Sequence, residues 1–227
     1  MHFKTQNNLK SIIKHGPVVA IFAHPDDEAF GPAGTLTKLA KNHDVYVLCA
    51  TKGEEGGDHK RLAQIRASEL QKSAKIIGIK KVFFLGFIDG TLSNSLYHKL
   101  AQTIEKRLRI IKPQTIITFE PRGISGHIDH ITISMVTSYV FYRLDFTKTM
   151  LQHCITEKSR KVVGDYFIYF PPGYKTSKID LIVNVENEWD IKLKAMMAHK
   201  SQIGDAKRIL KRHQKFPKEE YFLVTQK

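Results

Sequence analysis

The sequence predicts an α/β domain of three layers, built around a mainly parallel sheet. Short apolar runs rich in β-branched residues alternate with amphipathic stretches of helical length, and this alternation is typical of consecutive βαβ units. The chain has 227 residues, of which 42% are hydrophobic. That length is enough for one substantial core and too short for two generous domains. We therefore expect a single domain over residues 1–227.

The expected elements follow one another in a regular order. Four apolar runs predict the parallel strands, at residues 18–23, 45–49, 82–85 and 115–119. After a short helix or arm up to residue 15, helices are expected at about 31–41, 61–77, 95–111 and from 127 onward. The last of these carries an apolar stripe at helical spacing, formed by Ile128, Ile131, Met135 and Tyr139. Weaker signals predict strands at 166–170, 179–185 and 221–224, and a helix at 189–201.

A dense polar cluster directly follows the first strand. The segment His24-Pro25-Asp26-Asp27-Glu28 places an imidazole and three carboxylates within five residues. Carboxylates this close repel one another unless they face solvent or a cation, and the end of a core strand offers little solvent. In open α/β sheets, ligands collect beyond the carboxyl ends of the strands. The cluster therefore favours a cation site, and the alternative is a polar turn in which an Asp caps the next helix.

A second polar cluster follows the fourth strand and ends in His127-Ile128-Asp129-His130. The i,i+3 spacing of the two histidines puts both rings on neighbouring parts of one helical face. The two strand ends could then converge on one ion, held by His24, Asp27 and His130. Two imidazole nitrogens and one carboxylate oxygen suit zinc, and three protein ligands leave a fourth position open for water, as in catalytic sites.

Together, the two clusters resemble the LmbE-like / PIG-L family of zinc-dependent N-acetylglucosaminyl deacetylases. Weaker matches agree in order along the chain: Thr51-Lys52-Gly53-Glu54-Glu55-Gly56, Arg66-Ala67-Ser68-Glu69-Leu70, Asp89-Gly90 and His199-Lys200-Ser201-Gln202. The resemblance covers about residues 18–202. It implies a Rossmann-like domain and a hydrolase that removes the acetyl group from a small N-acetylglucosamine conjugate. It also implies Zn²⁺ as the cofactor, with another divalent metal as the alternative.

The resemblance further implies how the catalytic residues share the work. Asp26, the neighbour of the ligand Asp27, would take a proton from the attacking water, which occupies the open position on the zinc. His127 would stabilise the oxyanion or protonate the leaving nitrogen. Asp129 would orient a histidine ligand by accepting its other N–H.

Other residues are expected around the site without taking part in the chemical steps. Three of them are expected to contact the substrate, namely Arg66, Glu54 and Asp89. His199 is expected to brace the fold or lie at the rim of the site, and Glu28 to bond loop amides. The glycine-rich loop at residues 51–58 is expected to be either a mobile rim that contacts the substrate or a plain connector.

The formal charge of +14 raises the question of an anionic partner. A basic stripe at helical spacing is formed by Lys207, Arg208, Lys211, Arg212 and Lys215. No aromatic-interleaved RNA motif accompanies it, so nucleic acid is not the expected partner. Two alternative functions stay open: a metal-dependent phosphoesterase, which usually needs more carboxylates than we find, and a basic nucleic-acid-binding protein on the same fold.

The remaining sequence features bear on the compartment of the protein. The first sixteen residues do not resemble a signal peptide, and no apolar run approaches the ~20 residues of a membrane span. The two cysteines, Cys49 and Cys154, provide no disulfide framework. We therefore expect a cytoplasmic protein without a membrane span. A homo-oligomer is compatible with the sequence.

Overall fold

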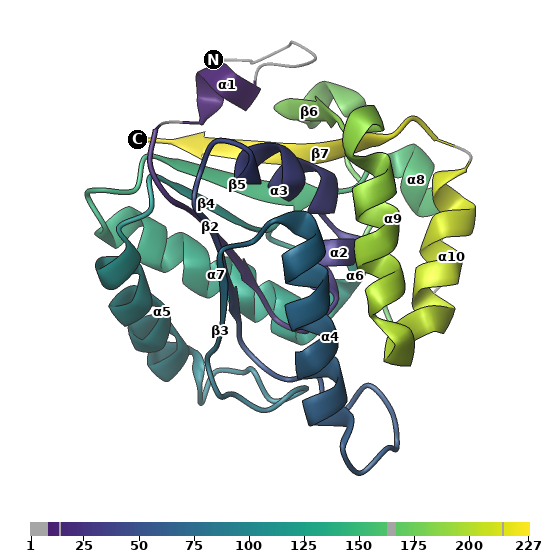
Figure 1. The fold of residues 1–227 in the computed structure, drawn as a ribbon. Helices are drawn as coiled ribbons and strands as arrows, with labels where there is room; N and C mark the ends of the chain where they lie inside the picture. Colours follow the sequence, from purple (N-terminus) through teal and green to yellow (C-terminus); the bar gives the residue numbers. More distant parts are fainter. Residues whose placement is uncertain (1–8, 14, 163–166, 215) are drawn as a thin grey trace.

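A seven-stranded sheet runs through the middle of the molecule (Figure 1). The structure, a computed structural model, describes residues 9–13, 15–162, 167–214 and 216–227. The strands lie in the order β3-β2-β1-β4-β5-β7-β6, with β1 to β5 parallel and β7 antiparallel to both of its neighbours. Their bounds are β1 Val18–Phe22, β2 Val45–Cys49, β3 Lys81–Phe84, β4 Thr115–Phe119, β5 Thr149–Cys154, β6 Leu181–Asn184 and β7 Glu219–Gln226.

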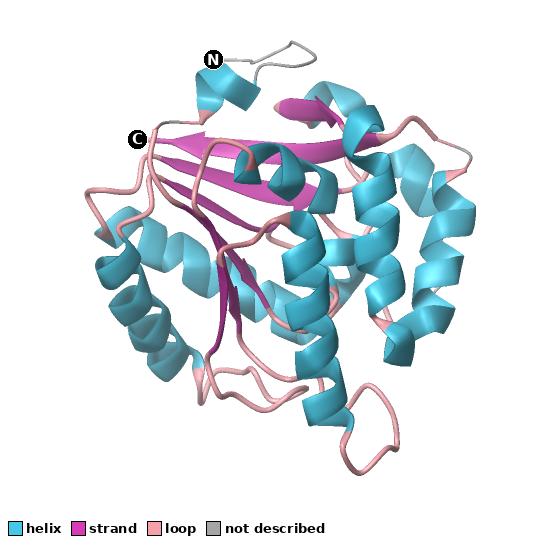
Figure 2. Cartoon of the chain, in the orientation of Figure 1, coloured by secondary structure: helices cyan, strands magenta, loops and turns pink. Residues whose placement is uncertain are grey.

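Helices cover both faces of the sheet, which gives the three expected layers (Figure 2). α3, α4 and α9 pack together on one face, and α5 packs on α7 on the other. The bounds are α1 Leu9–Ile12, α2 Asp27–Phe30, α3 Ala33–Ala40, α4 Leu62–Ile77, α5 Tyr97–Ile111, α6 Gly123–Gly126, α7 Ile128–Arg143, α8 Glu157–Lys161, α9 Trp189–Ala198 and α10 Ile203–His213. Among the described residues, none of the helices has both the length and the apolar character needed to cross a bilayer.

The central strands β1 and β4 are buried along their whole length. A strand covered by helices on both faces needs apolar side chains on both faces, which explains the continuous apolar runs. Within the sheet, Val18 of β1 pairs with Val45 of β2 on one side and with Thr115 of β4 on the other. The helices that follow β1 and β4 lie on opposite faces of the sheet (Figure 1), so the carboxyl ends of these two strands form its topological switch point, where ligands of such sheets bind. Both polar clusters of the sequence follow these strand ends.

The predicted fold class is confirmed, but three elements after α7 differ from the expectation. Residues 167–170 form no strand, and residue 166 lies outside the described residues. Ile168 in this segment is fully exposed, so the segment does not pair with the sheet. The helix that begins at Trp189 ends at Ala198, because the backbone of His199 leaves the helical region with φ −84° and ψ 67°. Finally, β5 was not expected, because Gln152 and His153 interrupt its apolar pattern.

The apolar stripe expected for α7 lies on the outside of the helix. Ile131 is half-buried, and the other three members of that stripe are exposed: Ile128, Met135 and Tyr139. The face that packs against the sheet carries Ile133, Val136 and Val140 instead. Because α7 has apolar residues on both faces, their spacing alone could not identify the buried one.

Candidate active site

The structure brings the three expected metal ligands together at the carboxyl ends of β1 and β4. His24 lies just after β1, Asp27 is the first residue of α2, and His130 lies in the first turn of α7. Nδ1 of His24 is 3.1 Å from Nε2 of His130 and 3.8 Å from Oδ2 of Asp27. Oδ1 of Asp27 is 3.4 Å from the same nitrogen of His130. Three ligand atoms from these residues lie within 4.8 Å of one another, close enough to share one ion.

Hydrogen bonds on the far sides of the rings turn both imidazoles toward this point. Nε2 of His24 lies 2.7 Å from Oδ1 of Asp89 and 3.2 Å from Oδ2 of Asp129, so it carries a proton. Nδ1 of His130 lies 3.2 Å from the carbonyl oxygen of Gly123 and donates to it. The two remaining nitrogens therefore point their lone pairs at each other across 3.1 Å, an arrangement that needs a proton or a cation between them. This donor set fits zinc, including the carboxylates that orient its histidines.

Without a metal, the charges of the cluster favour a proton at that point. Burial alone would lower the pKa of His24, but hydrogen bonds to Asp129 and Asp89 raise it to about 10. Burial and the nearby charge of His24 hold the pKa of His130 well below its usual range. His24 is therefore the protonated partner, and a metal must displace its proton in order to bind.

Asp26 lies beside the ligands in a strained backbone conformation. Its φ of 118° lies in the left-handed region, which a residue with a side chain adopts at a cost of about 1–3 kcal/mol. Its backbone N–H donates to Oε2 of Glu28 at 3.2 Å. Burial raises the pKa of the Asp26 carboxyl to about 7, although the charge of Arg66 opposes this shift. A carboxylate in this position, beside the candidate metal ligands, is suited to taking and returning a proton.

Arg66, an expected substrate contact, is bonded within the protein to Asp26. Its guanidinium donates to the carbonyl oxygens of Gly53 and Pro25, each at 2.8 Å, and to Oδ2 of Asp26 at 3.0 Å. A side chain at Gly53 or Gly56 would collide with this guanidinium. Gly53 and Gly56 of the loop at residues 51–58 therefore make room for Arg66. The geometry gives Arg66 a role in holding Asp26, and contact with the substrate stays a prediction.

Glu28 joins the Asp26 loop to two distant helices. Its Oε1 accepts from Oγ of Ser73 in α4 at 2.5 Å and from Nε2 of His199, just after α9, at 2.8 Å. Burial opposes ionisation of Glu28, but the charge and hydrogen bond of His199 hold its pKa below its ordinary value. The same pairing raises the pKa of His199 against the effect of its own burial. Because Glu28 also accepts from the Asp26 amide, this buried ion pair supports the strained backbone directly.

His127 caps the start of α7 with its own ring. Nδ1 accepts the backbone N–H of Asp129 at 3.1 Å. The proton of the neutral ring must then be on Nε2, which is available as a hydrogen-bond donor. Burial, together with the charge of His24, lowers the pKa of His127, so this neutral form is favoured. The ring centroid lies 4.7 Å from that of His24.

Of the remaining predicted residues, Asp129 and Asp89 contact His24, and Glu54 bonds within its own loop. Asp129 lies where it was expected and also accepts the backbone N–H groups of Gly90 and Leu92, at 2.8 and 3.1 Å. Oδ1 of Asp89 lies 2.7 Å from Nε2 of His24, and the expected contact of Asp89 with the substrate stays a prediction. Glu54 accepts the N–H of Lys52 within its own loop and is not among the grouped ligands.

Sequence reasoning missed that α4 is a support for the site. Arg66, Glu69 and Ser73 are spaced i, i+3 and i+7, which places them along one helical face. Glu69 accepts from the backbone N–H and the hydroxyl of Ser201, at 2.9 and 2.6 Å. The spacing of these polar residues on a half-buried helix was a usable signal. The bonds between Glu69 and Ser201 also bring the motifs around Arg66 and His199 into contact.

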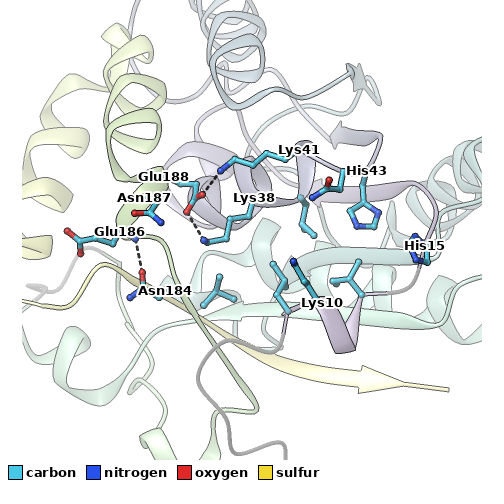
Figure 3. Close-up of a pocket in the computed structure, with 14 residues that line it drawn as sticks. Lys10, His15, Lys38, Lys41, His43, Asn184, Glu186, Asn187 and Glu188 are labelled. Carbon is cyan, nitrogen blue, oxygen red and sulfur yellow. Dashed lines mark hydrogen bonds and ion pairs between the residues drawn. The ribbon is translucent and has the colours of Figure 1, made fainter.

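A cavity of about 1050 Å³ lies at the amino-terminal ends of β1 and β2, away from the candidate metal ligands (Figure 3). Its lining includes His15 and His43, which precede β1 and β2, together with lysines of α1 and α3. Figure 3 shows Glu188 between two of these lysines, with its carboxylate 2.8 Å from Lys38 and 2.7 Å from Lys41. The charges at this point are thus paired, and the cavity does not adjoin the candidate metal ligands.

Comparisons with known proteins identify the family of this chain. A family profile described as PIG-L, GlcNAc-PI de-N-acetylase, matches residues 19–141. The probable N-acetyl-alpha-D-glucosaminyl L-malate deacetylase 2 of Bacillus subtilis (strain 168) is 31% identical over 198 residues, with 82% of each chain covered. The 1D-myo-inositol 2-acetamido-2-deoxy-alpha-D-glucopyranoside deacetylase of Corynebacterium glutamicum (strain R) is 27% identical over 229 residues, with 86% of this chain and 78% of that protein covered.

A solved structure extends the likeness to the fold. The N,N'-diacetylchitobiose deacetylase from Pyrococcus horikoshii matches with a TM-score of 0.71 over 96% of this chain and 87% of that chain. At 20% identity this match shows the fold alone. The expected enzyme class, a hydrolase of N-acetyl amides, is confirmed at the level of the family. Through the family profile and its similarity to named deacetylases, this chain belongs to the PIG-L family of de-N-acetylases.

Proposed function

We propose that this protein is a metal-dependent hydrolase that removes the acetyl group from an N-acetylglucosamine-type conjugate and releases acetate and the free amine. The observation that carries the proposal is the convergence of His24, Asp27 and His130 on one point, with Asp26 beside it. The named relatives act on malate and inositol conjugates of N-acetylglucosamine, which supports this class of small substrate. Two buried free cysteines agree with a reducing compartment such as the cytoplasm.

The metal would be held by Nδ1 of His24, Nε2 of His130 and the carboxylate of Asp27. Zn²⁺ suits these ligands, and other divalent ions are compatible with them. When bound, such an ion would polarise the acetamide carbonyl and lower the pKa of a coordinated water.

The protein's own groups supply the proton transfers. Asp26 takes a proton from the attacking water and then delivers it to the departing amine. His127 cannot easily supply that proton, because its neutral ring has only the Nε2 proton, whose loss would leave an anion. The Nε2–H group is suited to donating a hydrogen bond to the carbonyl oxygen as negative charge develops there. Asp26 therefore serves as both base and acid, and His127 as the oxyanion donor.

The phosphoesterase alternative receives less support from the same geometry. A second group of possible ligands in the described residues, His24, Asp89 and His127, shares His24 with the first. Two-metal phosphoesterases hold two ions about 3.5–4 Å apart between both reacting oxygens. One shared imidazole does not provide two separate sets of ligands.

The proposal is tested by measuring acetate release from the zinc-loaded protein. A matched panel contains the malate and inositol conjugates of N-acetylglucosamine, N,N'-diacetylchitobiose and a phosphoester control. We expect acetate from at least one amide and no phosphate. Asp26→Asn should keep its metal and lose about 10²–10⁴-fold in turnover, as expected for a proton-transfer residue. The control Asp44→Asn changes an exposed carboxylate and should behave as wild type. Normal turnover in Asp26→Asn would contradict the mechanism.

A further inference from the structure

We propose that Glu120 is a positioning residue of the metal site, which fixes the ligand His130 through the carbonyl oxygen of Gly123. Glu120 directly follows β4, and its side chain is 2% exposed. The polar clusters of the sequence do not include it, and within the described residues it is in neither group of possible metal ligands. The inference rests on the metal site of the proposed function and names a further residue on which that site depends.

The ring of His130 is held by stacking and by one hydrogen bond. The ring of Phe119 lies parallel to it, with centroids 4.1 Å apart and an interplanar angle of 3°, and the ring of His127 stacks at 4.9 Å. A half-turn about the Cβ–Cγ bond keeps an imidazole in the same plane, so stacking alone does not determine which nitrogen faces the metal. The bond from Nδ1 to the carbonyl oxygen of Gly123, at 3.2 Å, makes that choice.

The carbonyl group of Gly123 belongs to a turn with a strained backbone. Gly123, Ile124 and Gly126 have φ values of +66°, +62° and +80°. Glycine adopts such values freely, but a β-branched residue such as Ile124 rarely does. The turn also lies directly on α7, because a side chain at Gly123 would come within 2.8 Å of Cβ of His130. A turn of this shape persists only where its surroundings hold it.

The side chain of Glu120 holds this turn from the side opposite His130. Its Oε1 accepts the backbone N–H of Ile124 at 2.9 Å, and its Oε2 accepts that of Arg122 at 3.0 Å. The N–H of Ile124 and the carbonyl of Gly123 belong to one planar peptide group and point in opposite directions. The bond to Glu120 on one side therefore directs the carbonyl oxygen toward Nδ1 of His130 on the other.

Two further side chains fix the second oxygen of the Glu120 carboxylate. The hydroxyl of Tyr174 donates to Oε2 at 2.7 Å, and Nε of Arg122 donates to it at 3.2 Å. The guanidinium of Arg122 also lies 4.1 Å from the centroid of the Tyr174 ring. Hydrogen bonds to a charged acceptor are strong, so they hold the carboxylate in one orientation. Tyr174, which lies outside the segment matched by the family profile, thus supports His130 through Glu120.

The first test is a competition titration with zinc on the metal-free full chain. In Glu120→Gln one carboxylate oxygen becomes an amide nitrogen, which donates and cannot accept, so a bond to the turn or to its clamp is lost. The zinc affinity should fall by about tenfold, the lower end of the range for residues that support a metal ligand. Glu188→Gln is the matched control, because its carboxylate is also 2% exposed and ion-paired but lines the cavity away from the candidate ligands. It should bind zinc like the wild type.

The second test removes a single hydroxyl group from the clamp. Tyr174→Phe should lower the zinc affinity severalfold, whereas Tyr221→Phe, which loses a similar bond to Glu219 at 2.8 Å, should not. In metal-free protein, NMR measures how fast the Nδ1 proton of His130 exchanges with water. This exchange should be faster in Glu120→Gln and in Tyr174→Phe, because the bond to the Gly123 carbonyl oxygen is weakened, and unchanged in both controls.

The inference is overturned if Glu120→Gln keeps both the zinc affinity and the exchange rate of the wild type. An equal loss of affinity in Glu188→Gln would also overturn it, because the effect would then follow from stability alone. If Glu120→Gln does not fold, Tyr174→Phe decides by the same two measurements. If the wild type binds no zinc, the proposed function fails, and the exchange rate alone decides whether Glu120 fixes the ring.

Discussion

Replacing Glu28 by Gln tests whether the ion pair of Glu28 and His199 stabilises the turn that carries Asp26. The substitution keeps the shape of the side chain and removes its charge. It removes the charge that keeps the ring of His199 protonated against its burial, and both side chains are at most 1% exposed. Removing one partner of such a buried pair costs about 3–5 kcal/mol of the free energy of unfolding. Solvent screening does not reduce this figure, because neither group contacts water.

The expected pH dependence of this loss follows from the two pKa shifts. The pKa of Glu28 is held below its ordinary value of 4.5, so its contribution is complete above that pH and is lost as the pH falls through the folded value. The pKa of His199 is raised above 6.5, so its contribution is complete below that pH and is lost as the pH rises through the folded value. The deficit of Glu28→Gln should therefore be greatest between pH 4.5 and 6.5.

The assay is urea unfolding of metal-free protein at pH 6, followed through the fluorescence of Trp189, the single tryptophan. The variants Glu28→Gln and His199→Gln and their combination form a double-mutant cycle. We expect a coupling energy of about 2 kcal/mol or more between the two sites, within the range of residues in direct contact. Additive effects, with a coupling below roughly 0.5 kcal/mol, would refute the role assigned to this pair.

Three further predictions follow from the site and the core. Asp89→Asn should weaken zinc binding by roughly 10–100-fold in a competition titration, because the residue orients the ligand His24; unchanged affinity would contradict this. Zinc uptake at pH 8 should release about one proton, since the pKa of His24 near 10 keeps the metal-free ring charged, and calorimetry in two buffers measures it. Lys192→Met should cost about 3–5 kcal/mol of unfolding free energy by leaving buried Glu220 without its cation, whereas Lys80→Met, which removes one partner of an exposed pair, should unfold like the wild type.

The central part of the fold was predictable because its signals are local. The apolar runs of β1 and β4 need no tertiary information, since strands buried on both faces are apolar throughout. The order of clusters along the chain also indicated a shared site at the carboxyl ends of these strands. The carboxyl-terminal third was less predictable. Segment 167–170 has an apolar composition typical of a strand, and its real position against Gly126 depends on a contact 40 or more residues away in the chain.

The candidate site was also predictable only in part. The spacing of His24, Asp27 and His130 was sufficient to propose a metal site, because each residue follows a strand end. The partners behind the ligands were not predictable, since a carboxylate such as Asp89 has similar local sequence whether it faces a sugar or a histidine. Arg66 was expected to face the substrate for the same reason. Only the folded arrangement shows that Gly53 and Gly56 make room for its guanidinium.

The contact between His199 and Glu28 joins two parts of the candidate site that lie 171 residues apart in the sequence. The segment matched by the family profile stops at residue 141, yet the ring that bonds Glu28 next to Asp26 belongs to residue 199. Deletion of all residues after the matched segment would remove the ring of His199 that pairs with Glu28. Glu28 would then hold the backbone N–H of Asp26 less firmly. His199 and Ser201 thus support the candidate site from outside the matched segment, and substitutions of these two residues should alter the proposed activity without a contact to the substrate.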